Sequence, residues 1–337
     1  MNGLKDHFRR TIDYIRISVT DRCNLRCMYC MPAQGLVPLE HEEILRYEEI
    51  VRILKIAVRV GVKKVRITGG EPLVRKDLPY LIKLMKGIEG IKDLSVTTNG
   101  ILLERYADAL VEAGLDRVNV SLDSLKSDRY REITRGGDIN SIFRGINAAE
   151  KACLDPIKIN MVPIRGINDD EIIDFAMMTL KSPYQIRFIE FMPFAMPAVW
   201  KPGKFISAGE IKAVVESIGP LTPVIKRKSG PARYFRFNGA PGILGFISPL
   251  SNHFCGECNR LRLTADGKLR PCLFSETEID IRSALRSDAS DAEIERLIRL
   301  SVEMKPEGHK MRIQDSELSR FVASQKDSAR PMSRIGG

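Results

Sequence analysis

The 337-residue sequence has no long apolar run. None of its segments approaches the roughly 20 consecutive apolar residues that a helix needs to span a bilayer. The first residues, MNGLKDHFRRTIDY, include basic side chains but lack the apolar core of a secretory signal. We therefore expect a cytoplasmic protein that has no membrane partner.

Runs of basic residues are also absent, although the chain is basic overall. It carries 53 Lys and Arg against 43 Asp and Glu, a net charge of +10, without a block of five consecutive basic residues. Such a charge can be a solvated surface or can serve an anionic partner. Several arginines stand beside cysteines and at the ends of expected strands, so we expect a polyanionic small molecule and no nucleic acid.

Histidine is scarce, with four residues, and the seven cysteines are unevenly placed. Six of them form two trios, which are Cys23, Cys27 and Cys30, and Cys255, Cys258 and Cys272. In a chain without a secretory signal, clustered cysteines are more often metal ligands than disulfides. Cys153 lies outside both trios at the end of an expected helix, and we expect it to be buried as an apolar residue.

Short β-branched segments alternate with helical ones over the first two-thirds of the chain. The expected strands cover residues 14–20, 63–70, 93–100, 117–123, 157–164 and 184–194. The expected helices cover residues 46–61, 78–88, 102–114, 141–153 and 169–182. This alternation predicts parallel strands in an α/β fold, namely an open, partial (β/α)6 barrel, with a doubly wound sheet as the alternative. Either fold places the ligand site at the carboxyl ends of the strands.

The pattern changes after residue 220, where we expect a domain boundary. Residues 1–220 would form the partial barrel. Residues 221–337 contain two expected antiparallel strands, the second cysteine trio, a helix over 291–305 and a tail that ends in Gly-Gly. We expect them to form a smaller C-terminal α+β domain that carries a second metal centre.

Three helix starts are expected from capping boxes. Ser207 with Glu210, Asn168 with Glu171, and Ser290 with Glu293 follow the pattern of a short polar residue and a glutamate three residues later. We expect the members of each pair to cap one another's backbone N–H groups.

The first trio, Cys23, Cys27 and Cys30, follows the first expected strand with the spacing C-x3-C-x2-C. A [4Fe–4S] cluster normally takes four cysteine ligands, so three leave one iron open for a small molecule. Catalytic metal sites keep an open position for the same purpose. The alternative is a zinc knuckle completed elsewhere, but this spacing is uncommon for zinc and only His41 lies nearby. We favour the iron–sulfur cluster.

The second trio, Cys255, Cys258 and Cys272, has the spacing C-x2-C-x13-C and again offers three ligands. It can hold a second cluster whose open iron binds substrate. Alternatively, a structural zinc or a closed cluster would take His253 or Cys153 as a fourth ligand.

Basic residues occur on several of the expected strands. Arg260 and Arg262 lie two residues apart, so on a strand both would face the same way. Arg16 and Arg66 lie on the first two expected strands. An unpaired buried charge is costly, and guanidinium groups suit phosphate, so phosphate groups would supply the missing partners.

Several motifs resemble those of the radical S-adenosylmethionine (SAM) superfamily. Tyr29 precedes the last cysteine of the first trio, and GGEP (69–72) follows the second expected strand. Together with SVTDRCNLRCMYC, TTNG, SLDS, RFIEFMPF, CNRLRL and the terminal GG, they resemble the GTP 3′,8-cyclase family from residue 11 to residue 337. The resemblance implies two [4Fe–4S] clusters, one at each trio, and SAM as cofactors.

The resemblance also implies roles for individual residues. SAM would be contacted by Tyr29, Gly70, Ser121 and Met192. The substrate GTP would be contacted by Arg16, Arg66, Thr97, Lys158, Arg260, Leu261 and Arg262. The terminal Gly336 and Gly337 would reach into the active site and be needed for catalysis. Glu71 of GGEP would either contact SAM or orient its loop.

The implied reaction is a radical cyclisation. A 5′-deoxyadenosyl radical from SAM would remove hydrogen from C3′ of GTP, and the C3′ radical would attack C8 of guanine. The product would be (8S)-3′,8-cyclo-7,8-dihydroguanosine 5′-triphosphate, in the first step of molybdenum cofactor biosynthesis. The implied partners are a downstream cyclic pyranopterin monophosphate synthase and a reductant protein, with a homodimer as one candidate assembly.

Two other functions remain as alternatives. A radical SAM peptide maturase would share the first trio, but such enzymes commonly carry more C-terminal cysteines. A metal-sensing or nucleic-acid-binding protein with two metal knuckles would share the basic charge, but the ordered strand–helix units with motifs at strand ends argue against it.

Overall fold

Six parallel strands form the centre of the fold. The computed structural model describes all residues except 1–2, 194–198, 226–229, 310, 312–329 and 336–337. The central strands are β1 (Tyr14–Ser18), β2 (Lys64–Thr68), β3 (Asp93–Thr98), β4 (Arg117–Ser121), β5 (Lys158–Met161) and β6 (Gln185–Ile189). They pair side by side in chain order.

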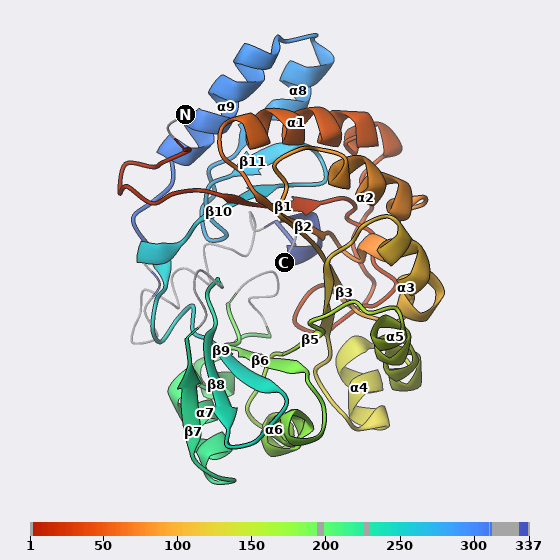
Figure 1. Cartoon of the computed structure of the whole chain (residues 1–337), viewed down its shortest axis with the longest axis vertical. Coiled ribbons are helices and arrows are strands. Elements are labelled where there is room, and N and C mark those ends of the chain that lie inside the picture. Colours follow the sequence, from red (N-terminus) through yellow and green to blue (C-terminus); the bar gives the residue numbers. More distant parts are fainter. Residues whose placement is uncertain (1–2, 194–198, 226–229, 310, 312–329, 336–337) are drawn as a thin grey trace.

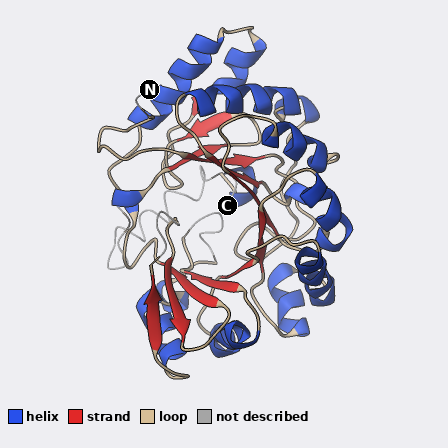
Figure 2. Cartoon of the chain, in the orientation of Figure 1, coloured by secondary structure: helices blue, strands red, loops and turns tan. Residues whose placement is uncertain are grey.

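Helices follow these strands and cover one side of the sheet. They are α1 (Tyr47–Arg59), α2 (Leu78–Lys86), α3 (Leu103–Glu112), α4 (Ser127–Thr134), α5 (Ile139–Lys151), α6 (Ile172–Lys181) and α7 (Ala208–Glu216). Figures 1 and 2 show the strands as an open arc with helices α1 to α6 on its outer side. In α1 the buried residues Ile50, Ile53, Leu54 and Ala57 follow the helical repeat, so one face packs on the sheet. The predicted partial barrel is confirmed.

The C-terminal segment extends the same sheet at both edges. Strands β7 (Leu221–Val224), β8 (Arg233–Phe237) and β9 (Ile243–Ile247) continue it beyond β6. Strands β10 (Arg260–Leu263), β11 (Lys268–Arg270) and β12 (Ile279–Asp280) continue it beyond β1. The two segments that meet at residue 220 therefore share one sheet.

Three further helices and five 3-10 turns complete the described fold. They are α8 (Ile281–Arg286), α9 (Asp291–Glu303), α11 (Met332–Ile335), and the 3-10 turns η1 (His41–Glu43), η2 (Pro72–Val74), η3 (Asp169–Glu171), η4 (Pro202–Lys204) and η5 (Cys255–Glu257). Within the described ranges, no helix is both long and apolar enough to cross a membrane.

Of the three expected capping boxes, the one at Ser207 forms in full and the one at Ser290 forms in half. Ser290 accepts the N–H of Glu293 at 3.3 Å, while the Glu293 carboxylate binds Arg296. Ser207 accepts the N–H of Glu210 at 3.2 Å, and Glu210 accepts the N–H of Ser207 at 2.9 Å. The box expected at Asn168 is wrong, because this side chain caps no helix. Asn168 is fully buried and donates to the carbonyl oxygens of Asp123 and Val162 at 2.7 and 3.1 Å, which ties together the loops after β4 and β5.

Candidate functional site

A cavity lies inside the arc of strands and connects the two cysteine trios. It has a larger part of about 410 Å³, lined by the first trio, and a smaller part of about 150 Å³, lined by the second. Arg16, Ile189, Pro231, Ile247 and Met332 line both parts, so the two are continuous. Ligands at the two trios could therefore contact one another.

The trios lie at opposite ends of the strands. Cys23 follows the carboxyl end of β1, as the sequence predicts. Cys258, in contrast, precedes β10, whose Arg260 is in register with Tyr14 at the amino end of β1. The site therefore extends along the inside of the barrel, beyond the expected carboxyl edge.

The thiols of the first trio lie in surroundings that disfavour free thiolates. Burial, with Cys23 and Asp123 nearby, raises the pKa of Cys30 to about 12. Burial also raises the pKa of Cys27 well above its usual value, and that of Cys23 to a smaller degree. A cationic metal centre would reverse this, because it binds the thiolate directly.

Neither trio has the dimensions of a single-zinc site. A tetrahedral zinc ion with Zn–S bonds of about 2.3 Å holds its sulfur atoms about 3.8 Å apart. In the described part of the chain, neither trio brings its three sulfur atoms within 4.8 Å of one another. At least one sulfur–sulfur distance in each trio is therefore longer than a single tetrahedral zinc ion would set.

The GGEP loop packs directly against the loop that carries the first trio. A Cβ atom on Gly70 would lie 2.3 Å from the carbonyl oxygen of Arg22, and one on Gly69 would lie 2.6 Å from that of Thr20. Gly69 also has φ +157°. Only glycine allows this approach, so both glycines set the position of the segment that leads into Cys23.

Glu71 orients this loop. Its buried carboxylate accepts hydrogen bonds from the N–H of Leu73 at 3.0 Å, the hydroxyl of Thr98 at 2.7 Å and the N–H of Asn99 at 2.7 Å. Burial raises its pKa to about 7 against these three hydrogen bonds. The contacts with Thr98 and Asn99 join GGEP to the carboxyl end of β3.

Tyr29 is held by a buried aspartate. The Tyr29 hydroxyl donates to Asp123 at 2.5 Å, and the second oxygen of Asp123 accepts the N–H of Val162 at 2.9 Å. Burial raises the pKa of Asp123 to about 6, although both hydrogen bonds oppose this rise. Tyr29 lines the larger part of the cavity together with Gly70, Thr97 and Ser121.

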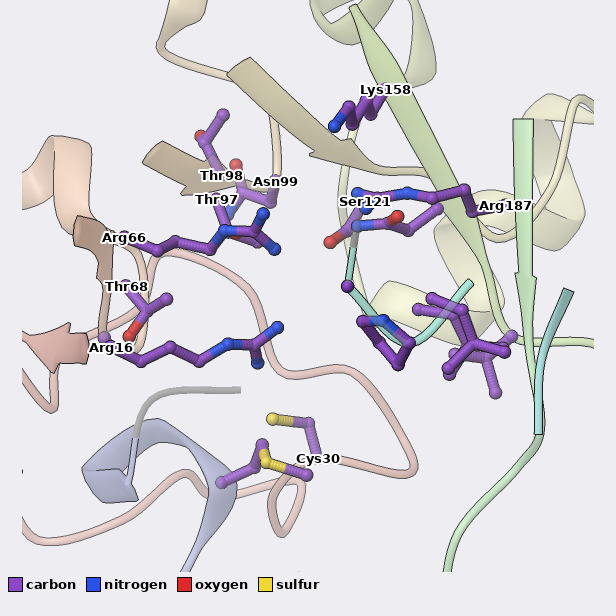
Figure 3. Close-up of a pocket in the computed structure, with 18 of the residues that line it drawn as sticks. Arg16, Cys30, Arg66, Thr68, Thr97, Thr98, Asn99, Ser121, Lys158 and Arg187 are labelled. Carbon is purple, nitrogen blue, oxygen red and sulfur yellow. The ribbon is translucent and has the colours of Figure 1, made fainter. Parts of the chain in front are cut away.

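Arginines from adjacent strands lie side by side in the cavity wall. Arg16 on β1 is in register with Arg66 on β2 and with Arg262 on β10. Arg187 on β6 reaches toward them from the other side, as Figure 3 shows. Burial lowers the pKa of Arg16 to about 10, with Arg66 and Arg260 adding to the effect and Tyr14 opposing it.

Positive charge greatly exceeds negative charge along the cavity. Its described lining includes nine basic side chains, which are Arg16, Lys64, Arg66, Arg117, Lys158, Arg187, Arg260, Arg262 and Lys305. The acidic ones are Asp93 and Asp123. Asp93 pairs with Arg117, and Asp123 accepts the Tyr29 hydroxyl. The remaining charge suits a polyanion.

The second trio is surrounded by cations. Burial raises the pKa of Cys258, but Arg260 and Lys305 outweigh it and lower that pKa to about 6. Lys305 is itself fixed, because it donates to the carbonyl oxygens of Arg260 and Pro271 at 2.8 and 2.7 Å. The environment thus favours the thiolate form of Cys258, which is the form that binds metals.

Helix α11 forms part of the cavity wall. Met332 lines both parts and Ser333 lines the larger one. Just before the helix, Arg330 pairs with Asp266 at 2.7 Å and with Glu278 at 2.8 Å. This double ion pair ties the chain near its C-terminus to the loop after β10 and to the segment before β12.

Several predicted residues are placed differently from expectation. Leu261 is fully buried in the hydrophobic core, so only its backbone could reach a ligand. Met192 lines the smaller part of the cavity, near the second trio. The predicted burial of Cys153 is wrong, because this residue is exposed in a left-handed turn (φ 60°) after α5 and lines neither part. Gly336 and Gly337 lie outside the described residues.

Three side chains of the site were not predicted from the sequence. Arg187 lies within the quoted motif RFIEFMPF, and its strand position could have identified it. Asp123 lies at the end of β4 in SLDS, where polar residues were noted as a group. Lys305 lies just beyond α9, and no sequence pattern connects it to the cavity.

Comparison with known proteins gives consistent matches over the whole chain. Residues 17–178 match the Radical SAM superfamily, and residues 184–311 match Molybdenum Cofactor Synthesis C. The chain is 54% identical to the GTP 3′,8-cyclase of Thermodesulfovibrio yellowstonii, covering 99% of this chain and 100% of that protein. It is 49% identical to the GTP 3′,8-cyclase of Alkaliphilus oremlandii, with the same coverage of both chains.

Solved structures share the fold at low identity. Streptococcus suis SuiB bound to S-adenosylmethionine has a TM-score of 0.57 and 17% identity, over 85% of this chain and 67% of that one. SuiB bound to the precursor peptide SuiA has a TM-score of 0.59 and 16% identity, over 87% and 68%. At this identity the likeness concerns the fold alone.

Proposed function

The chain belongs to the GTP 3′,8-cyclase family of radical SAM enzymes, and we propose that its cavity binds GTP between two iron–sulfur clusters. Its function is accordingly the 3′,8-cyclisation of GTP, the first step of molybdenum cofactor biosynthesis. The observation that carries the site proposal is the layer of arginines between two cysteine trios.

At the first trio, Cys23, Cys27 and Cys30 would hold the [4Fe–4S] cluster that membership of the radical SAM family implies, with SAM at its open iron. When bound, the cluster and SAM supply the 5′-deoxyadenosyl radical. Gly70, Ser121 and Tyr29 would contact SAM, since all three line this part of the cavity. Asp123 would keep the Tyr29 ring in place through its hydrogen bond.

In the middle of the cavity, the basic residues would bind the triphosphate of GTP. Arg16, Arg66, Arg187 and Lys158 point into the larger part (Figure 3). Arg16 and Arg187 each leave a buried Nε atom without a hydrogen-bond partner among the described residues. Phosphate oxygens would accept from these groups and offset the repulsion between neighbouring guanidiniums. Thr97 would add a hydroxyl contact.

At the second trio, Cys255, Cys258 and Cys272 would hold a second [4Fe–4S] cluster, whose open iron would face the guanine base. Arg260 and Lys305 support this, because they favour the thiolate of Cys258. Arg262 and Arg260 would contact the phosphates from this side. Leu261 would contribute through its backbone, and Met192 would contact SAM only if SAM extends toward the smaller part.

The remaining proposals concern the chain ends and partners. Gly336 and Gly337 would enter the cavity, and α11, which lines it, supports this by bringing the chain to within two residues of them. The division at residues 1–220 and 221–337 is kept as a functional division between the two trios. A reductant protein, a downstream cyclic pyranopterin monophosphate synthase and a homodimer are proposed from the family alone.

The test is an anaerobic assay of the cluster-loaded chain. We expect reduction in the presence of SAM to give 5′-deoxyadenosine at a rate that GTP strongly raises, together with a cyclised nucleotide. If 5′-deoxyadenosine forms at the same rate with and without GTP, the radical SAM chemistry stands but the proposed GTP site is wrong. This result would favour a radical SAM peptide maturase. Measured iron and labile sulfide distinguish the cyclase and the peptide maturase from a zinc protein, which contains neither.

A further inference from the structure

One cysteine of the second trio also belongs to another group of metal-binding side chains. The donor atoms of His253, Cys255 and His309 all lie within 4.8 Å of one another. In the described part of the chain, this is the one trio of His, Cys, Asp or Glu side chains with such close spacing. Unlike the two cysteine trios, it has the dimensions of a site for a single ion.

His309 has the hydrogen-bonding arrangement of a metal ligand. Its Nε2 lies 2.8 Å from the carbonyl oxygen of Pro249. A carbonyl oxygen can only accept, so Nε2 carries the proton, and Nδ1 of the neutral ring has a free lone pair. Nδ1 is buried and has no hydrogen-bond partner among the described residues. Histidines that bind metals typically donate one N–H to a carbonyl in this way.

The ring of His309 is also fixed by packing. Its centroid lies 4.5 Å from that of Phe274 and 4.1 Å from that of His253. His253 is exposed and Cys255 is half-buried, so an ion can reach the group from solvent. Two imidazoles and one thiolate suit Zn²⁺ and Fe²⁺, and three protein ligands leave the fourth position to water.

We propose that His253, Cys255 and His309 bind one divalent transition-metal ion of the Zn²⁺ or Fe²⁺ type in the chain that lacks its second cluster. Binding of the ion releases the proton of the Cys255 thiol to solvent. The ion and the second cluster exclude each other, because both require Cys255. This second half of the proposal rests on the proposed role of Cys255 as a cluster ligand.

Cobalt(II) gives a direct test of the site. The full-length chain, with Cys23, Cys27 and Cys30 all changed to alanine and free of clusters, is titrated anaerobically with Co²⁺. We expect one ion per chain, with tetrahedral d–d bands and thiolate-to-cobalt charge transfer. His253→Ala and His309→Ala should each weaken binding more than about 100-fold, because even changes outside the ligand shell cost 10–100-fold.

Cys258→Ala is the matched control for this titration. Cys258 belongs to the second trio but not to the His–Cys–His group, so its loss should leave cobalt binding unchanged. Since His253 is exposed, His253→Ala tests the site without disturbing the core. Circular dichroism shows whether each variant is folded. The proposal is overturned if both histidine variants bind Co²⁺ like their parent, or if Cys258→Ala abolishes binding.

Competition tests the exclusion. Wild-type chain loaded with Zn²⁺ and then reconstituted with iron and sulfide should take up about half the iron of zinc-free chain, because one of two four-iron clusters is blocked. His253→Ala should take up the full amount despite Zn²⁺. Full uptake by zinc-loaded wild type would overturn the exclusion. If zinc-free wild type takes up only one cluster, the two-cluster proposal is wrong. The cobalt titration still decides whether His253, Cys255 and His309 bind a metal ion.

Discussion

At the scale of single residues, the arginines of the cavity wall carry more positive charge than the acidic side chains of the described lining can balance. Arg66 and Arg187 are buried, and burial lowers the pKa of each. Buried charges usually have partners, because moving a charge out of water is costly. Here the acidic side chains of the lining are already engaged, since Asp93 pairs with Arg117. A bound polyanion is the partner that would make this arrangement stable.

Arg66→Ala tests this interpretation. Loss of one charge-assisted hydrogen bond costs about 1.5–3 kcal/mol, so GTP binding should weaken roughly 10- to 100-fold. Guanosine binding should change less than about twofold, because guanosine has no phosphate. Equilibrium dialysis of the cluster-loaded chain measures both constants. Arg105→Ala, at an exposed position on α3, is the control, and equal losses for GTP and guanosine would refute phosphate contact.

Glu71 makes stability depend on pH near neutrality. Its folded-state pKa of about 7 lies above the usual value of 4.5, so the folded chain binds a proton that the unfolded chain does not. Stability from this group is therefore lost as the pH rises through 7, by about 1.4 kcal/mol between pH 6 and pH 8. Glu71→Gln lacks this titration.

The melting temperature of Glu71→Gln relative to wild type should thus rise by about 2 °C between pH 6 and pH 8. Anaerobic scanning fluorimetry at several pH values measures this difference. Glu112→Gln, at an exposed position on α3, should show no such trend. A constant difference between Glu71→Gln and wild type would mean that Glu71 does not titrate in this pH range.

At the scale of elements, helix α11 depends on contacts outside itself. It has four residues, too few to be stable alone. The ion pairs of Arg330 with Asp266 and Glu278 therefore help to hold a wall of the cavity. Arg330→Ala should raise amide hydrogen exchange in residues 332–335 and lower GTP-dependent formation of 5′-deoxyadenosine several-fold.

Arg296→Ala is the control for this prediction. Arg296 also pairs with a glutamate, Glu293, but on the exposed face of α9, where such pairs contribute little. It should alter neither readout. If Arg330→Ala behaves like Arg296→Ala, α11 is held by its packing rather than by this anchor.

Local sequence patterns predict most of the helices and strands, but they do not predict which strands pair when these are far apart in the sequence. The six parallel strands follow from β-branched runs, and the capping box at Ser207 from two side chains. Asn168 looked like a cap because spacing cannot reveal that its amide is drawn into a buried contact between loops. The pairing of β10 with β1 brings Arg262 beside Arg16 across nearly three-quarters of the chain. Nothing in a single sequence specifies such a pairing, because it depends on the packing of the whole sheet.

At the scale of the whole molecule, the pairing of β10 with β1 brings the two cysteine trios to the same cavity. The first trio comes from the N-terminal part of the chain and the second from the C-terminal part, yet both line one continuous cavity. The two trios share no cysteine, and their electrostatic surroundings differ, because the pKa of Cys30 is raised and that of Cys258 is lowered. The two proposed clusters should therefore assemble independently, although the ligands bound at them would meet in the middle of the cavity.

Cys258→Ala should lose one cluster and keep the other. We expect iron to fall from about eight to about four atoms per chain. Reductive cleavage of SAM should persist at a low rate that GTP no longer raises, since the first trio is intact and the guanine site is not. Cys153→Ala is the control, because this exposed cysteine lies outside both trios and should leave the iron content unchanged. Loss of all iron in Cys258→Ala would show that the clusters depend on one another, and the cavity would then have to be treated as a single metal-dependent folding unit.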